Sequence, residues 1–242
     1  MIRPPRVGIL GGTFDPIHVG HLAAGLAARS ALGLDSVVVV PAHDPPHRTV
    51  HPRASGAHRF AMAALAIDGV AGFALSDMEL LADGPSFTAS TLRRLHGRGL
   101  EPAVLFFIIG SDAFAEIASW REYPAILDFC HFAVISRPGC ALEALGARLP
   151  DLAPRMRTTG TQGSSAESPA AAAALSIFLV ESPTPDVSST RIRDRARLGL
   201  PIAGLVPPAV ERHIRRHGLY GGRGESPAAA ARCRPPRGEH DA

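Results

Sequence analysis

Short apolar runs alternate along the chain with segments whose apolar residues recur at helical spacing. The runs that predict buried strands lie at residues 6–10, 36–41, 73–76, 104–109, 132–135 and 176–180. The helical segments lie at residues 22–28, 58–67, through 92–95, from 112, after 190 and at 207–217. A strand, a helix and a strand within roughly the first 40 residues require parallel pairing and a right-handed crossover. The alternation predicts an α/β fold, a single doubly wound parallel-sheet (Rossmann-like) domain over residues 1–220.

Polar residues and glycines mark the ends of these helices. Ser86 or Thr88 is placed to cap the helix that runs through 92–95. Residues 188–190 offer three candidate caps for the arginine-rich helix that follows them. Gly33 is expected to end the first helix, because glycine adopts the left-handed conformation that closes a helix.

Three segments lack a regular pattern. Residues 141–149 favour a short helix, but residues 158–174 are rich in Gly, Ala, Ser and Thr and have no period. We therefore interpret about 141–175 as a mobile low-complexity excursion. Residues 221–242 predict a disordered tail in the same way. Residues 42–55 hold three prolines and three histidines, which is consistent with either a binding loop or an exposed basic loop.

Composition narrows the class of protein. A hydrophobic fraction of 46% is sufficient for a sizeable core. All 25 basic residues are arginines, but the net charge is only +3, so we expect no nucleic-acid partner. The three cysteines show no pair spacing, which indicates neither disulfides nor zinc and favours a reducing, cytoplasmic compartment. No run approaches the roughly 18 apolar residues of a membrane span, so no membrane is expected.

The turn between the first strand and the first helix carries the strongest chemical signal. It contains, in order, Gly11, Gly12, Thr13, Phe14, His18 and His21. The free N–H groups and the positive end of the dipole at a helix start favour an anion. Residues three apart share a helix face, so the two histidines point to the same side. The stretch predicts a phosphate site with two imidazole donors.

A second stretch offers similar chemistry at another helix start. Ser188, Ser189 and Thr190 provide hydroxyls and free N–H groups, and Arg193 lies on the side that reaches back to the start of the helix. By itself this pattern is more typical of a helix cap with solvated arginines. Two such anion sites together predict a polyphosphate ligand such as a nucleotide.

Further motifs complete a recognisable set. They are Pro45-Pro46-His47-Arg48, Ser86-Phe87-Thr88 with Thr91-Leu92, Ile108-Ile109-Gly110-Ser111-Asp112 with Trp120, Arg137-Pro138-Gly139 and residues 205–220. With the two phosphate stretches, they resemble the nucleotidyltransferase superfamily that has the His-x-Gly-His signature. Within it, the chain is similar to the bacterial nicotinate-nucleotide adenylyltransferases. The resemblance covers about residues 6–139 and 176–220.

The resemblance implies an enzyme of NAD biosynthesis that joins the AMP moiety of ATP to nicotinate mononucleotide and releases pyrophosphate. The implied catalytic residues are His18, His21 and Arg193. The implied ATP-binding residues are Gly11, Gly12, Thr13, Phe14, His18, His21, Gly110, Asp112, Ser188, Ser189, Thr190 and Arg193. The implied mononucleotide-binding residues are Arg48, Thr88, Asp112, Trp120 and Arg121.

Several of these residues also have ordinary structural interpretations. Asp112 suits a helix cap, and Trp120 suits a core or rim aromatic. The family commonly has tyrosine where Phe87 stands, which removes a hydroxyl and little else. No acidic cluster marks a dedicated metal site, so Mg²⁺ is expected to arrive with ATP. The histidines of residues 42–55 have no second cluster to support them, and no protein-held metal is expected.

Two competing functions remain open at this stage. An adenylyltransferase of the same class could prefer nicotinamide mononucleotide or another phosphate acceptor such as phosphopantetheine. A different class, a non-catalytic nucleotide sensor or a basic RNA-binding module, would bind ATP or RNA without releasing pyrophosphate. The sequence also leaves open whether the chain forms a homo-oligomer.

Overall fold

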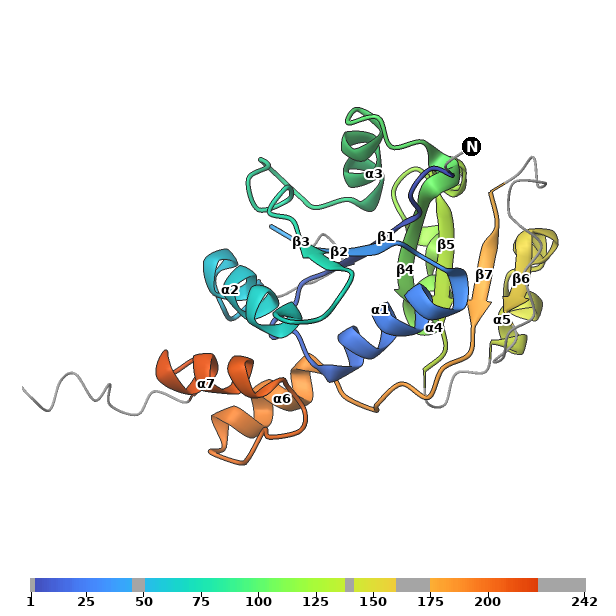
Figure 1. Ribbon diagram of the computed structural model, residues 1–242. Coiled ribbons are helices and arrows are strands. Elements are labelled where there is room, and N and C mark those ends of the chain that lie inside the picture. Colours follow the sequence, from blue (N-terminus) through green and yellow to red (C-terminus); the bar gives the residue numbers. More distant parts are fainter. Residues whose placement is uncertain (1–2, 45–50, 138–141, 160–174, 222–242) are drawn as a thin grey trace, which may run out of the picture.

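Seven parallel strands form one sheet in the described part of the chain (Figure 1). The computed structural model describes residues 3–44, 51–137, 142–159 and 175–221. The strands are β1 (Val7–Gly12), β2 (Ser36–Pro41), β3 (Phe73–Leu75), β4 (Leu105–Gly110), β5 (His131–Ile135), β6 (Met156–Thr159) and β7 (Ile177–Val180). Their order across the sheet is β3-β2-β1-β4-β5-β7-β6. The predicted α/β parallel-sheet fold is confirmed.

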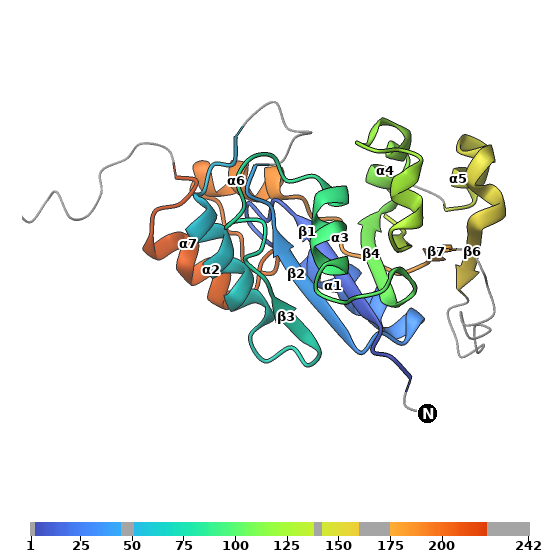
Figure 2. The ribbon, with the colours of Figure 1, turned by 90° about the horizontal axis from the view of Figure 1, so that it is seen from above.

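Helices cover both faces of this sheet (Figure 2). The α-helices are α1 (Val19–Leu32), α2 (Gly56–Ile67), α3 (Thr88–His96), α4 (Ser111–Phe114), α5 (Glu143–Arg148), α6 (Ser189–Arg197) and α7 (Pro208–Arg216). Short 3-10 turns are η1 (Pro102–Val104), η2 (Ile117–Ser119), η3 (Ala125–Asp128) and η4 (Pro150–Arg155). Side chains of α1, α2, α6 and α7 join one buried cluster, and those of α3, α4 and α5 join a second.

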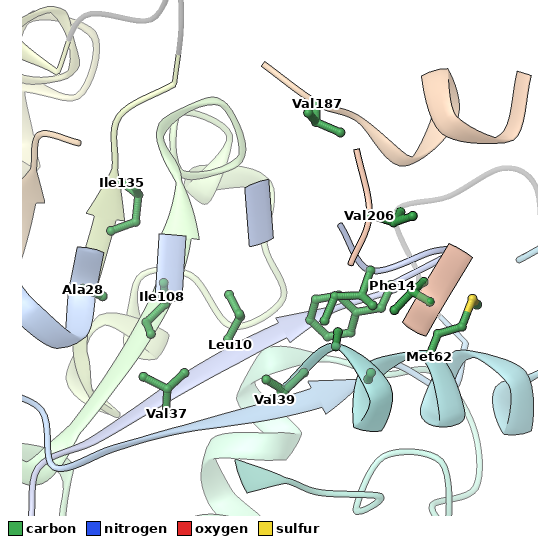
Figure 3. Packing of buried hydrophobic residues seen from close by; sticks show 14 of the residues in the cluster. Leu10, Phe14, Ala28, Val37, Val39, Met62, Ile108, Ile135, Val187 and Val206 are labelled. Atoms are coloured by element: carbon green, nitrogen blue, oxygen red, sulfur yellow. The ribbon is translucent and has the colours of Figure 1, made fainter. Parts of the chain in front are cut away.

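The strands bury both of their faces, which explains their continuous apolar sequences. In β4, Phe106 and Ile108 belong to the first cluster, whereas Phe107 belongs to the second. Figure 3 shows the first cluster, to which Leu10 of β1 and Met62 of α2 both belong. Period-two alternation between two apolar faces therefore produces the unbroken runs seen in the sequence.

The helix ends confirm two of the expected caps and contradict a third. Gly33 closes α1 in the left-handed conformation, with φ of 58°. The Ser188 hydroxyl caps α6 by accepting from the Arg191 N–H. Neither Ser86 nor Thr88 caps α3, because the N-cap position of this helix is occupied by Phe87. The Ser86 hydroxyl instead accepts from the backbone N–H of His43.

The short helix expected within residues 141–149 is confirmed as α5, whereas the irregular structure expected after it is wrong for residues 150–159. Residues 142–159 contain α5, η4 and the edge strand β6, which pairs with β7. Residues 160–174 lie outside the described residues. The β6 sequence Met-Arg-Thr-Thr does not predict a strand, because an edge strand is partly exposed and needs no apolar run.

The sheet places a crevice at the carboxyl ends of β1 and β4. From β1 the strand order runs to β2 and β3 on one side and to β4 and β5 on the other. Connections that diverge in this way leave a gap above the strand ends, where doubly wound sheets bind their ligands. The described helices include none that is long and apolar enough to cross a membrane.

Candidate active site

A cavity of about 410 Å³ occupies this crevice. Its wall includes residues 11–13 at the end of β1 and His18 and His21 at the start of α1. The wall also includes Thr88 of α3 and Trp120 after η2. His18 and Trp120, which the sequence separates by about 100 residues, therefore line one cavity.

The two histidines of the cavity wall stack against each other. Their ring centroids are 3.6 Å apart, with an interplanar angle of 21°. The His18 backbone N–H donates to His21 Nδ1 over 3.2 Å. Because Nδ1 accepts, a neutral His21 carries its proton on Nε2, which is then the nitrogen able to donate to a ligand.

His18 differs from His21 in its burial. Its side chain is only 3% exposed, and no described residue makes a hydrogen bond to its Nδ1. Burial, and after it the charge of Arg137, lower the pKa of His18 from 6.5 to about 4. His18 is therefore a neutral imidazole at pH 7. The residue lines the cavity, and its buried Nδ1 has no hydrogen-bond partner among the described residues.

The loop before α1 holds this geometry through Phe14. Phe14 adopts φ of 51°, and its ring is 1% exposed within the first core cluster (Figure 3). A Cβ on Gly12 would lie 2.9 Å from that ring, so glycine is needed there. Phe14 also packs edge-on against His21, with centroids 5.0 Å apart. Its side chain is thus part of the core, and only its backbone is available to a nucleotide.

The start of α6 is bonded directly to the same loop. The Ser189 hydroxyl donates to the Pro16 carbonyl over 2.9 Å. Arg193 Nη1 donates to the Asp15 carbonyl over 2.8 Å, and its Nη2 donates to the Thr190 hydroxyl over 3.1 Å. The two stretches predicted to bind phosphate are therefore adjacent. The cavity wall itself includes residues 184–187, which lead into α6.

Two of the five predicted mononucleotide residues are in the cavity wall, and Asp112 and Arg121 are not. Thr88 and Trp120 line the cavity, and the indole packs edge-on against Phe107 with centroids 6.0 Å apart. The Arg121 guanidinium lies 4.5 Å from the centre of the Phe87 ring.

An ion pair lies beside the cavity wall at the end of β4. Gly110 at the end of β4 lines the wall, and the exposed Asp112 pairs with Arg137, Oδ1 to Nε, over 3.2 Å. Asp112 does not cap α4, because the residue before that helix is Gly110. Arg48 lies outside the described residues.

The sequence assigned no site role to four polar residues of this region. Arg137 lines the cavity, the buried Asp15 and Arg59 lie near the partly buried Tyr220, and Tyr220 donates to Asp15. Arg59 is 2% exposed and donates to three carbonyls at the ends of β1 and β2. Arg137 and Tyr220 belong to motifs named above, but their roles, like those of Asp15 and Arg59, depend on partners far away in the sequence. The described residues contain no group of three or more His, Cys, Asp or Glu that could hold a metal ion.

Comparison with known proteins covers nearly the whole chain. Residues 9–195 match the family model described as cytidylyltransferase-like. The probable nicotinate-nucleotide adenylyltransferase of Roseiflexus sp. is 41% identical over 216 residues, 88% of this chain and 97% of the relative. The probable enzyme of the same name from Desulfatibacillum aliphaticivorans is 39% identical over 223 residues, 89% of this chain and 99% of the relative.

Solved structures show the same fold at low sequence identity. The Plasmodium falciparum nicotinic acid mononucleotide adenylyltransferase complexed with NaAD superposes with a TM-score of 0.67 at 18% identity. The match covers 90% of this chain and 98% of that one. The family match spans both His18 and Arg193, the two ends of the predicted phosphate site.

Proposed function

The chain belongs to the nicotinate-nucleotide adenylyltransferase family, within the cytidylyltransferase-like group, and we propose that it joins the AMP moiety of ATP to nicotinate mononucleotide. The products are deamido-NAD, an intermediate of NAD biosynthesis, and pyrophosphate. The observation that supports this most directly is the single cavity that runs from the stacked histidines to Thr88 and Trp120.

The reaction requires little from the protein beyond positioning and charge. The 5′-phosphate oxygen of the mononucleotide attacks the α-phosphorus of ATP, and a new phosphorus–oxygen bond forms. The bond between the α-phosphorus and the oxygen that bridges the α- and β-phosphorus atoms breaks. Pyrophosphate leaves with the electron pair of that bond. The attacking oxygen is already anionic near neutral pH, so no protein base has to remove a proton. Catalysis then depends on alignment and on stabilising charge that develops on the phosphates.

His18 and His21 supply that stabilisation in the proposal. His21 donates from Nε2, and the neutral His18 contacts a phosphate oxygen from the buried side of the cavity. Arg193 supplies a fixed positive charge from the opposite side. The backbone of residues 11–14 and the hydroxyl and N–H groups of residues 188–190 surround the remaining phosphate oxygens.

Mg²⁺ enters this proposal as part of the ATP substrate. The donor set favours this assignment because the carboxylate of Glu79 in the cavity wall already accepts from the Thr91 hydroxyl over 2.5 Å. The metal neutralises charge on the leaving pyrophosphate when it is bound. The residues of this chain then need only to hold the phosphates.

The acceptor is proposed to lie beside Thr88 and Trp120 of the cavity wall. Trp120 offers a face for the pyridine ring, and backbone groups near Thr88 and Arg121 receive the nicotinate carboxylate. Asp112 accepts from a ribose hydroxyl, in competition with its ion pair to Arg137. Arg48 contributes a phosphate contact from its loop.

One assay tests the proposed function against its rivals. Pyrophosphate release is measured with ATP and, in turn, nicotinate mononucleotide, nicotinamide mononucleotide and phosphopantetheine. We expect the highest kcat/KM with the first acceptor, together with formation of deamido-NAD. A higher kcat/KM with either of the other two acceptors would overturn the acceptor assignment. ATP binding without pyrophosphate release from any acceptor would favour a non-catalytic nucleotide-binding module.

A further inference from the structure

Asp15 lies in the loop between β1 and α1, and its buried carboxylate joins three parts of the chain. Its side chain is 2% exposed. One oxygen accepts from the Arg53 N–H over 2.8 Å, and the other accepts from the Ala54 N–H over 3.0 Å and from the Tyr220 hydroxyl over 2.8 Å. A carboxylate placed so deeply needs several donors to offset its lost hydration, and the fold supplies them from residues far away in the sequence.

Arg193 depends on the same residue. Its Nη1 donates to the Asp15 carbonyl over 2.8 Å and lies 3.9 Å from the Asp15 carboxylate. The Arg193 side chain is 19% exposed, so most of it is packed while the guanidinium stays at the edge of the loop. The backbone of Asp15 thus fixes the guanidinium, and its carboxylate balances the charge.

Tyr220 brings the end of the described chain into this arrangement. It follows α7 and adopts φ of 66°. Burial, and then the charge and hydrogen bond of Asp15, raise the pKa of the Tyr220 hydroxyl, so the group stays protonated and donates. This hydrogen bond spans 205 residues of sequence.

We propose that Asp15 and Tyr220 are positioning residues of the ATP site, which hold the Arg193 guanidinium beside the loop that carries His18. Asp15, Tyr220 and Arg193 are all absent from the residues that line the cavity in the described chain. Asp15 contacts Arg193 directly, and Tyr220 contacts Asp15, so we assign their effect to the position of the Arg193 guanidinium. The segment after α7 then sets the strength of phosphate binding from outside the cavity. The inference rests on the proposed role of Arg193 in holding the phosphates of ATP.

The test removes one hydroxyl and asks whether its effect passes through Arg193. The dissociation constant for ATP is measured by calorimetry for wild type, Tyr220→Phe, Arg193→Ala and the double variant. We expect Tyr220→Phe to weaken ATP binding about tenfold, as for a lost hydrogen bond to a charged acceptor. In the Arg193→Ala background the same substitution has no further effect, because the guanidinium that it positions is gone.

Tyr123→Phe is the matched control. Tyr123 is the other tyrosine of the chain, and its partly buried ring packs against the second core cluster, away from Asp15. The Tyr123→Phe variant also loses a phenolic hydroxyl, and it should keep the wild-type affinity for ATP. An equal loss of affinity from Tyr220→Phe with and without Arg193 would contradict the inference, since it would show a general structural effect. Wild-type affinity in Tyr220→Phe would contradict it as well.

Asp15→Asn gives a second test through the sign of its effect. A buried negative charge near a polyphosphate repels it, so a simple charge effect would make this variant bind ATP more tightly. Positioning through Arg193 predicts weaker binding instead, and tighter binding would overturn the inference. These affinities do not depend on turnover. A wild-type protein that binds ATP but releases no pyrophosphate would refute the proposed function and still leave both tests decisive.

Discussion

Two buried histidines lie at opposite ends of the strands of the same sheet, and we propose different roles for them. His18 follows β1, at the carboxyl ends of the strands, and His131 begins β5, at their amino ends. Each is 3% exposed, and burial is the largest cause that lowers the pKa of each to about 4. Burial and charge state therefore do not distinguish them.

Their hydrogen bonds do. His131 Nδ1 accepts from the Ser176 N–H over 2.9 Å, and its ring stacks on Phe106 with centroids 4.8 Å apart. Nδ1 of His18 has no such partner among the described residues. An unsatisfied buried polar atom costs free energy, and folds retain few of them. We infer that the missing hydrogen bond, rather than burial, distinguishes the histidine that is proposed to contact a ligand.

The largest expected effect concerns the stacked pair at the cavity. We predict that His18→Ala and His21→Ala each lower turnover at least about 100-fold, the loss typical of a removed charge-stabilising donor. Steady-state pyrophosphate release provides the measurement. Turnover near the wild-type value in either variant would mean that the comparison assigns the wrong role to that residue.

The opposite result is expected at the other end of the sheet. His131→Ala removes a ring packed against Phe106 and leaves the Ser176 N–H without its acceptor. We predict a loss of about 2 kcal/mol in the free energy of unfolding, with turnover unchanged within about twofold. Urea unfolding and the same pyrophosphate assay measure the two quantities. A large loss of turnover in a folded His131→Ala protein would remove the distinction between the two histidines.

Acid should destabilise the fold through both residues. A histidine whose pKa is lowered from 6.5 to about 4 binds fewer protons in the folded than in the unfolded state between these values. Its contribution is complete above pH 6.5 and is lost as the pH falls towards 4. Each histidine adds a slope of up to about 1.4 kcal/mol per pH unit. Urea unfolding at several pH values should show a shallower slope for His131→Ala than for wild type, and an unchanged slope would contradict its buried neutral state.

Local patterns in the sequence predicted the central strands, because each strand depends on neighbouring residues. They also selected the two stretches proposed to bind phosphate, which the structure brings together. Gly12 and His18, for example, act through a turn that a few consecutive residues define. The edge strand β6 and the Asp15–Tyr220 contact were not predictable in this way. β6 is held by pairing with β7, and Asp15 meets a partner 205 residues away. Such features arise only once the sheet has assembled, so no periodicity records them.

The smallest expected effect separates the electrostatic surroundings of the two histidines. After burial, the second-largest cause that lowers the pKa is the charge of Arg137 for His18 and the charge of Arg6 for His131. Arg137→Gln should therefore raise the pKa of His18 and leave that of His131 unchanged, and Arg6→Gln should do the reverse. Each rise is small because burial, the larger cause, remains. Titration of the imidazole signals by NMR measures both groups in one sample. A pKa rise at both histidines from either substitution would mean that the two ends of the sheet are electrostatically coupled, and the histidines could then no longer be compared as independent sites.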